Sequence, residues 1–300
     1  MLSLGVLWTA LTGGRAAQGP LAARKLTSVV IDSRQAMSGS LFVALRGERQ
    51  DGHDYVLDAF RRGATAALVN RPVPGCTLVL PVQGPLPEVT DPGPVCLQVP
   101  DVLRALQDLA GAWRRQFPGC RVVGVTGSVG KTSTKEAVAC VLAQRFRLLK
   151  SEGNLNNEIG LPLTLLRLDG HERAVLEMGM YAPGEIARLA EVARPQVGVV
   201  TNVGPVHLGR LGSMEAIAQA KAELAQSLPV DGVLVLNGDD PRVRAMAQGT
   251  AAARVITFGL GPGCDLRAEG VSSRGLQGVE AIFRYRDEAH QVHLKWLGRH

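Results

Sequence analysis

The run GVTGSVGKT at Gly124–Thr132 holds the residues best suited to chemistry in this chain. It follows the β-branched residues Val122, Val123 and Val125 and opens a helical pattern from Thr134 to Leu142. Glycines in such a turn let backbone N–H groups face an anion, and a helix N-terminus adds positive partial charge. Strand, glycine-rich turn, Lys-Thr and helix in this order predict a site for nucleotide phosphates.

The loop residues have distinct expected roles. Lys131 would reach the β- and γ-phosphates, and Thr132 would hold Mg²⁺. The general phosphate-loop pattern has a glycine where this chain has Val125, so only the shorter TGxxGKT core is present. A glycine-rich turn without a ligand is the alternative interpretation. We assign nucleotide binding to the core and the serine after it, namely Thr126, Gly127, Ser128, Val129, Gly130, Lys131, Thr132 and Ser133.

Two further residues follow apolar runs that read as strands. Glu177 closes the run AVLE, and a carboxylate at that point can reach a Mg²⁺ ion near Thr132. His207 ends TNVGPVH and is either a ligand or an ordinary histidine. Lys221, in IAQAKAEL, is by pattern alone a solvent-exposed helical lysine.

An asparagine cluster lies in SEGNLNNEIGLPLTLL, which begins at Ser151. Asn154, Asn156 and Asn157 have short amide side chains suited to a turn lined against a ligand. The same residues could simply cap the helix expected from the run Ile159–Leu166. The pattern leaves both interpretations open.

Composition indicates a globular protein. A length of 300 residues suggests about two domains. The net charge of +6 suits anionic substrates, and no Lys/Arg-rich block indicates nucleic acid. The five cysteines are odd in number and form no CxxC, which favours reduced thiols and a cytoplasmic location. No apolar run is long enough to span a membrane, and Leu2–Leu11 reads as a buried helix rather than a signal peptide.

The order of apolar stretches divides the chain into two blocks with different patterns. The first has a helix at Tyr55–Arg62, a surface loop at Pro81–Pro94 and short strands at Val29–Ile31, Leu41–Leu45, Ala66–Val69 and Thr77–Leu80. An amphipathic helix, Val102–Phe117, ends at Pro118-Gly119. We therefore place a small α/β domain at 1–104, a linker helix at 105–120 and a central domain at 121–300.

The second block alternates strands and helices, which predicts a parallel sheet covered on both faces. Its expected strands are Arg121–Val125, Ala174–Glu177, Val197–Thr201, Gly232–Leu236 and Val255–Phe258. Its expected helices are Thr132–Gln144, Gly184–Ala193, Ser213–Ser227 and Pro241–Gln248. From Cys264 to Leu297, polar and apolar residues alternate, which predicts antiparallel strands.

Several motifs in one order resemble the Mur ligases of peptidoglycan synthesis. They are TGSVGKT, NLNNEIGLPLTLL, LEMGM with GEIARLA, TNVGPVHLGRLGS with IAQAKAEL, and LNGDDP. The N-terminal stretch with IDSR, GSLFVALRG and DGH is similar to the UDP-substrate domain of that family. The resemblance begins near Asp32 and is closest to the branch that adds D-alanyl-D-alanine to UDP-N-acetylmuramoyl-tripeptide.

The resemblance implies a role for each matching residue. Lys131 and Thr132 would bind ATP phosphate and Mg²⁺, Glu177 a first Mg²⁺ and His207 a second. Lys221 matches a lysine that is carbamylated by CO₂, so that its carbamate oxygens help hold the second metal. The UDP-sugar end would be lined by Asp32, Ser33, Arg34, Arg46, Gly47, Asp51, Gly52 and His53. Asn154, Asn156 and Asn157 would lie near the reacting carboxylate and phosphate.

The activity implied is amide-bond formation through an acyl phosphate, with ATP and Mg²⁺. The family continues past the point where this chain stops, at Gly298-Arg299-His300. We therefore expect its C-terminal Rossmann-like domain to be absent, and the chain to be a monomer that binds the UDP substrate but ligates poorly. A related Mur or folylpolyglutamate-type ligase, and a non-catalytic nucleotide-sugar-binding module, are the alternatives.

Overall fold

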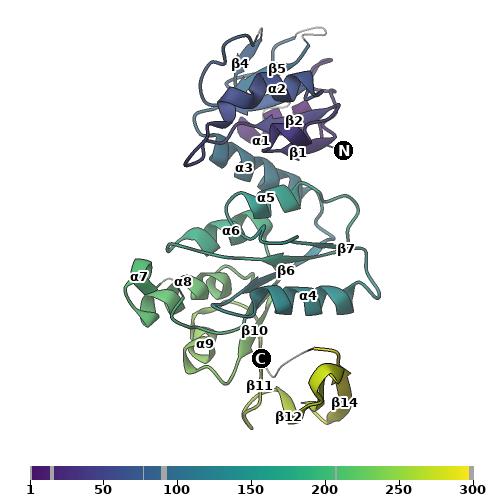
Figure 1. Ribbon diagram of the computed structural model, residues 1–300, viewed down its shortest axis with the longest axis vertical. Helices are drawn as coiled ribbons and strands as arrows, with labels where there is room; N and C mark the ends of the chain where they lie inside the picture. The colour runs from purple at the N-terminus through teal and green to yellow at the C-terminus, as the bar shows by residue number, and fades with distance from the viewer. Residues whose placement is uncertain (1, 14–16, 77, 89–92, 207, 297–300) are drawn as a thin grey trace. The chain divides into compact units, whose positions relative to one another are not determined.

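A computed structural model describes residues 2–13, 17–76, 78–88, 93–206 and 208–296 (Figure 1). The chain divides into two compact units. The first comprises Met1–Gly119 and Glu152–Gly170, and the second comprises Cys120–Ser151 and His171–His300. Among the described residues, no helix is both long and apolar enough to cross a membrane.

The first unit is built on a five-stranded parallel sheet in the order β1-β2-β3-β5-β4. Its strands are β1 (Ser28–Val30), β2 (Ser40–Val43), β3 (Ala66–Val69), β4 (Val79–Pro81) and β5 (Val95–Gln98). Its helices are α1 (Leu4–Leu11), α2 (Val56–Arg61), α3 (Val102–Arg115) and α5 (Gly160–Leu165), with short 3₁₀ turns η1 (Ser33–Gln35) and η2 (Gly52–Tyr55).

Both faces of this sheet are buried, because side chains alternate between them along each strand. Phe42 of β2 belongs to the same apolar cluster as Val56 and Ala59 of α2. The neighbouring Leu41 points to the opposite face and is fully buried there, and α3 contacts both α1 and β3. The N-terminal run is the buried helix α1, as predicted, with Trp8 among its buried residues.

The two compact units differ from the predicted domain boundaries in one segment. The segment Glu152–Gly170 belongs to the first unit, and the predicted linker helix is part of that unit's interior. The reason is that α5 packs against α3. The indole N–H of Trp113 donates to the carbonyl of Leu168, and the side-chain amide of Gln107 donates to the carbonyl of Glu158.

The second unit has a nine-stranded sheet in the order β14-β13-β12-β11-β10-β9-β6-β8-β7. Its strands are β6 (Arg121–Thr126), β7 (Leu148–Lys150), β8 (Arg173–Glu177), β9 (Val197–Val200), β10 (Val233–Asn237), β11 (Arg254–Gly259), β12 (Leu266–Ser273), β13 (Val279–Tyr285) and β14 (Glu288–Leu294). Its helices are α4 (Lys131–Leu142), α6 (Glu185–Ala193), α7 (Leu208–Leu211), α8 (Met214–Gln226) and α9 (Pro241–Ala245), with 3₁₀ turns η3 (Met246–Gly249) and η4 (Gly275–Gln277).

Strand β6 has helices on both faces. Val123 and Val125 form an apolar cluster with Ala139 of α4. On the other face, a Cβ at Gly124 would lie 3.1 Å from a methyl of Leu224 in α8, so the glycine gives α8 room to approach. Strand β6 therefore ends between two covering helices, and its carboxyl end is fixed from both sides.

The predicted fold class is confirmed. Strands β6 to β11 are parallel, and β12 to β14 form an antiparallel segment after them. Two strands, β5 and β7, are missing from the sequence prediction. Both are short, and β5 follows directly on the Pro-rich stretch that was predicted as a loop.

Candidate active site

The predicted phosphate loop connects β6 to α4 in the second unit (Figure 1). Two of its glycines have backbone angles that other residues rarely adopt, with φ of 150° at Gly127 and 83° at Gly130. Gly127 also passes so close to β9 that a Cβ there would lie 1.9 Å from the hydroxyl oxygen of Thr201. The loop shape therefore depends on glycine at residue 127 for both its angle and its packing.

Thr201 and Asn202, which directly follow β9, hold the loop in place. Neither residue was assigned a role from the sequence. The Thr201 hydroxyl donates to the carbonyl of Val129 at 2.6 Å. The Asn202 side chain accepts from the Val129 N–H at 2.9 Å and donates to the same residue's carbonyl at 3.0 Å. The sequence signal for this pair was the presence of two polar residues directly after a buried apolar strand, because ligands bind at the carboxyl ends of strands in parallel sheets.

Lys131 is folded back onto the loop. Its ammonium donates to the carbonyls of Gly127, at 2.9 Å, and Ser128, at 3.3 Å. Burial lowers the pKa of Lys131, and the nearby carboxylate of Glu177 opposes that shift. The loop thus holds a partly desolvated cation next to its own backbone, where a phosphate could replace the two carbonyls as its partner.

Thr132 and Glu177 meet as the sequence predicted. The Thr132 hydroxyl donates to the Glu177 carboxylate at 2.9 Å, and Glu177 is 2% exposed. Hydroxyl and carboxylate oxygens are hard donors of the kind that Mg²⁺ prefers, so this pair fits that ion. No cluster of three His, Cys, Asp or Glu side chains suited to a metal occurs among the described residues. His207 lies outside the described residues.

Lys221 is not the exposed helical lysine that its pattern indicates. It lies on the buried face of α8 and is 4% exposed. Burial lowers its pKa to about 8, and the positive charge of Lys131 adds to that effect. The resemblance, which implied a functional lysine, agrees with this burial better than the local pattern does.

The asparagine cluster lies in the first unit and includes a helix cap. The Asn157 side-chain oxygen accepts from the N–H groups of Ile159 and Gly160, at 3.2 and 2.8 Å, where α5 begins. The N–H of Asn156 donates to the carbonyl of Asn154 at 2.8 Å, which makes a tight turn before the cap. Capping is thus observed, and the predicted contact of these residues with reactants stays a prediction.

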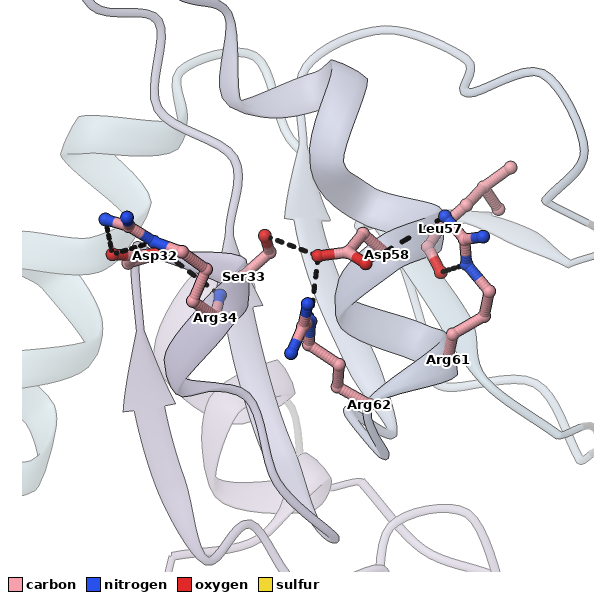
Figure 2. Close-up of polar contacts among 7 residues, drawn as sticks. All are labelled: Asp32, Ser33, Arg34, Leu57, Asp58, Arg61 and Arg62. Carbon is pink, nitrogen blue, oxygen red and sulfur yellow. Dashed lines mark hydrogen bonds and ion pairs between the residues drawn. The ribbon is translucent and has the colours of Figure 1, made fainter.

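In the first unit, Asp32, Ser33 and Arg34 form a turn after β1 (Figure 2). Asp32 accepts from the backbone and the guanidinium of Arg34, and these bonds lower the pKa of Asp32. The Ser33 hydroxyl donates to Asp58 at 2.8 Å, and Arg62 donates to the same carboxylate oxygen at 2.9 Å. The Arg34 side chain is 81% exposed, so it is open to an anionic ligand.

The second predicted substrate segment folds as a short hairpin. Arg46 pairs with Asp51 in a β-bridge, and the N–H of Gly47 donates to the carbonyl of Gln50 at 2.9 Å. A Cβ at Gly52 would lie 2.6 Å from the carbonyl oxygen of Leu45, so the hairpin requires glycine there. Arg46 and Gly47 are both exposed.

His53 has a structural position in this hairpin. It is 4% exposed, and its Nε2 accepts from the backbone N–H of Asn70 at 3.1 Å. The Nδ1 atom therefore carries the proton and donates to Asp51 at 2.6 Å. The N–H of His53 and its ring hold the pKa of Asp51 at about 2. The ring thus positions Asp51 and has no free polar edge for a substrate.

Comparison with known families decides what kind of protein contains these sites. A model of the Mur ligase middle domain matches residues 125–300, more than half of the chain. A model of the catalytic domain of the Mur ligase family matches residues 25–114. The chain belongs to the Mur ligase family.

Two curated relatives of this chain have the same name. The UDP-N-acetylmuramoyl-tripeptide–D-alanyl-D-alanine ligase of Bacillus subtilis is 42% identical over 262 residues, 85% of this chain and 53% of that protein. The ligase of the same name from Mycobacterium tuberculosis H37Rv is 41% identical over 288 residues, 92% of this chain and 55% of that protein. This Mur ligase chain spans about half the length of the curated relatives it matches.

Solved Mur ligase structures agree with the fold. Crystal structure I of MurF from Acinetobacter baumannii superposes with a TM-score of 0.83 at 28% identity, over 99% of this chain and 61% of that one. MurF ligase from Thermotoga maritima in complex with ADP gives a TM-score of 0.76 at 32% identity, over 89% of this chain and 57% of that one. The second unit thus has the fold of a protein solved with a nucleotide.

Proposed function

We propose that this chain forms the ATP-binding and nucleotide-sugar-binding part of a cytoplasmic ligase that joins D-alanyl-D-alanine to UDP-N-acetylmuramoyl-tripeptide. The names of the relatives that match both units support the choice of substrates. The observation that carries the ATP part is the Thr132–Glu177 hydrogen bond at the end of the phosphate loop, beside the partly desolvated Lys131.

In the proposed first step, the terminal carboxylate of the tripeptide attacks the γ-phosphorus of ATP. A new phosphorus–oxygen bond forms an acyl phosphate, and ADP leaves with the electrons of the broken bond. The loop residues contribute by position and charge. Backbone N–H groups near Gly130 and the ammonium of Lys131 face the phosphate oxygens, where negative charge is redistributed as the bond breaks.

In the proposed second step, the amine of D-alanyl-D-alanine attacks the acyl carbonyl, and phosphate leaves from a tetrahedral intermediate. The amine loses a proton, so the balance is one amide, one phosphate and one proton. The side chains of Asn154, Asn156 and Asn157 are proposed to lie near these reacting groups, and Asp32, Ser33 and Arg34 are proposed to face the UDP end.

Thr132 and Glu177 are the residues proposed to hold Mg²⁺, because they place a hydroxyl and a carboxylate within 2.9 Å of each other. When bound, Mg²⁺ neutralises phosphate charge. A second ion would be held by His207 and a carbamylated Lys221. The neutral amine of Lys221 would add to CO₂ to give a carbamate and one proton. Its lowered pKa, about 8, makes the neutral amine more available than in an exposed lysine.

Substrate binding is tested by calorimetry of the 300-residue chain with UDP-N-acetylmuramoyl-tripeptide. UDP-N-acetylglucosamine is the control for the uridine nucleotide alone, and the UDP-N-acetylmuramoyl-dipeptide tests for a ligase that adds the third residue. We expect the tripeptide form to bind most tightly. Preference for the dipeptide would assign the chain to that other ligase. No binding of any of the three by folded chain would contradict the proposed role of the first unit.

The second unit is tested separately with Mg·ATP. We expect the wild-type chain to bind it and Lys131→Met to lose most of that binding, since the substitution keeps the length of the side chain but removes its charge. Carbamylation is tested by ¹³C NMR in ¹³C-bicarbonate at pH 8, with Lys221→Met as the control. A carbamate signal present in both proteins would exclude Lys221 as its source.

A further inference from the structure

Lys135 is a fully buried lysine that the proposed mechanism does not use. It lies on α4, one helical turn after Lys131, and is 0% exposed. Its ammonium donates to the backbone carbonyl of Ser151 at 2.8 Å and pairs with the carboxylate of Glu136 at 3.1 Å. Burying an ammonium is costly, and a methionine would fill similar space without that cost. The charge therefore calls for an explanation other than packing.

The bond from Lys135 leads directly to the proposed metal ligand. Ser151 is itself fully buried, and its N–H donates to the carbonyl of Val175 at 3.1 Å. With its N–H and its carbonyl both engaged, the residue directs its hydroxyl oxygen to the N–H of Glu177, which donates to it at 3.2 Å. Glu177 in turn accepts from Thr132 at 2.9 Å.

These contacts form a closed path between two turns of one helix and the end of one strand. Lys135 and Thr132 are both on α4, and they are connected by Ser151, which directly follows β7, and by Glu177, which ends β8. Withdrawal of the Glu177 backbone would therefore have to break its bond to Ser151, and rotation of its side chain would have to break the bond from Thr132. Groups that orient a metal ligand in this way commonly govern metal affinity by about 10-fold or more.

We propose that Lys135 is a positioning residue, which through Ser151 fixes the backbone of Glu177 at the end of β8 and so places its carboxylate for Mg²⁺. The inference rests on the proposed function, because it takes Glu177 as a ligand of the nucleotide-bound ion. It adds a residue outside the loop and one turn beyond it. Lys135 itself touches neither phosphate nor metal in this arrangement and acts through the serine.

The test compares the Mg²⁺ requirement of nucleotide binding in matched variants of the whole chain. Lys135→Met removes the charge at the buried position, and Ser151→Ala removes the hydroxyl while keeping the carbonyl. Lys150→Met is the control, since Lys150 pairs with the same Glu136 but its side chain is 42% exposed. Binding of a fluorescent ADP is measured against increasing Mg²⁺, and the unfolding temperature of each variant is measured without ligand.

We expect Lys135→Met to raise the half-saturating Mg²⁺ concentration about 10-fold, and Ser151→Ala to raise it in the same direction. The double variant should be no worse than Lys135→Met, because both act on one path. Lys150→Met should stay within about 2-fold of wild type. A structural role alone predicts a lower unfolding temperature with an unchanged Mg²⁺ requirement, and that result would overturn the proposal.

Glu177→Gln separates this inference from the proposed function. If Glu177→Gln raises the Mg²⁺ requirement and Lys135→Met does not, only the positioning role of Lys135 is wrong. If wild-type chain binds the nucleotide with no Mg²⁺ dependence, or does not bind it, the proposed metal site is wrong and the role of Lys135 is wrong with it.

Discussion

The phosphate loop contains two glycines that should respond very differently to the same substitution. At Gly127, alanine would have to adopt φ of 150° and would place its Cβ 1.9 Å from the Thr201 hydroxyl oxygen. The unusual angle costs about 1–3 kcal/mol. Displacing the hydroxyl also breaks its bond to Val129, at about 0.5–1.5 kcal/mol. We therefore expect Gly127→Ala to destabilise the second unit by about 2–4 kcal/mol.

Gly130→Ala is the matched control. This glycine has φ of 83°, and nothing lies within 4 Å of a Cβ built there. Only the cost of the left-handed angle remains, which is about 1–2 kcal/mol. Both substitutions add one methyl group to the same loop, so the difference between them measures the contact with β9 rather than a general sensitivity of the loop.

Hydrogen exchange with mass spectrometry at increasing urea concentration measures this difference, because it follows peptides of the second unit separately from those of the first. A further variant sharpens the test. In a Thr201→Ala background the clash with the hydroxyl is gone, so Gly127→Ala should cost about 1 kcal/mol less than in wild type. Equal destabilisation by Gly127→Ala and Gly130→Ala would refute the argument from the 1.9 Å approach.

Three further predictions concern the other candidate residues. Arg34→Ala should weaken binding of UDP-N-acetylmuramoyl-tripeptide about 10-fold by calorimetry, whereas Arg61→Ala, at a similarly exposed arginine, should leave it unchanged. Asp51 has a folded pKa of about 2, below its usual 3.8, so its stabilising contribution is present above pH 3.8 and is lost as the pH falls through 2. We expect Asp51→Asn to cost about 1 kcal/mol near pH 6 in urea unfolding, after discounting for a side chain that is 27% exposed. This cost should shrink as the pH falls toward 2, and a constant difference would contradict the reasoning. Lys131→Met should abolish the rise in unfolding temperature that Mg·ATP gives the wild-type chain, and an equal rise in both would remove Lys131 from the site.

The parts of the fold predictable from sequence are those with local signals. The run Val122–Val125 followed by TGSVGKT specifies a strand, a turn and a helix within a few residues. Glu177 was correctly predicted to end a strand, and it stood out because an acid at the end of a buried strand is unusual. Both signals come from residues adjacent in the chain. They correctly predicted that Thr132 and Glu177 meet.

The features that the sequence did not indicate depend on long-range packing. Nothing in Glu152–Gly170 indicates that α5 packs on α3, because the bond from Trp113 to Leu168 joins residues far apart in the chain. Lys221 was interpreted as exposed because a lysine in a helix usually is, whereas the structure places it on the same buried face as Ile217 and Leu224. The predicted substrate role of His53 stays a prediction, and the use of both its ring nitrogens within the chain has no sequence signature.

The charges around the proposed metal site suggest why a carbamate would be useful there. Lys131 and Lys221 are both cations with lowered pKa values, and the charge of Lys131 contributes to the shift of Lys221. Glu177 is the carboxylate that opposes the shift of Lys131. While Lys221 is an ammonium, the side chains of Lys131, Lys221 and Glu177 together carry a net positive charge. They then favour a phosphate over a second divalent ion. A carbamate on Lys221 would reverse the sign of that side chain and add oxygen donors, so the same group would then attract a second Mg²⁺. In the proposed mechanism, proton loss from Lys221, CO₂ addition and binding of the second ion would thus be coupled, and each would become more favourable as the pH rises toward 8.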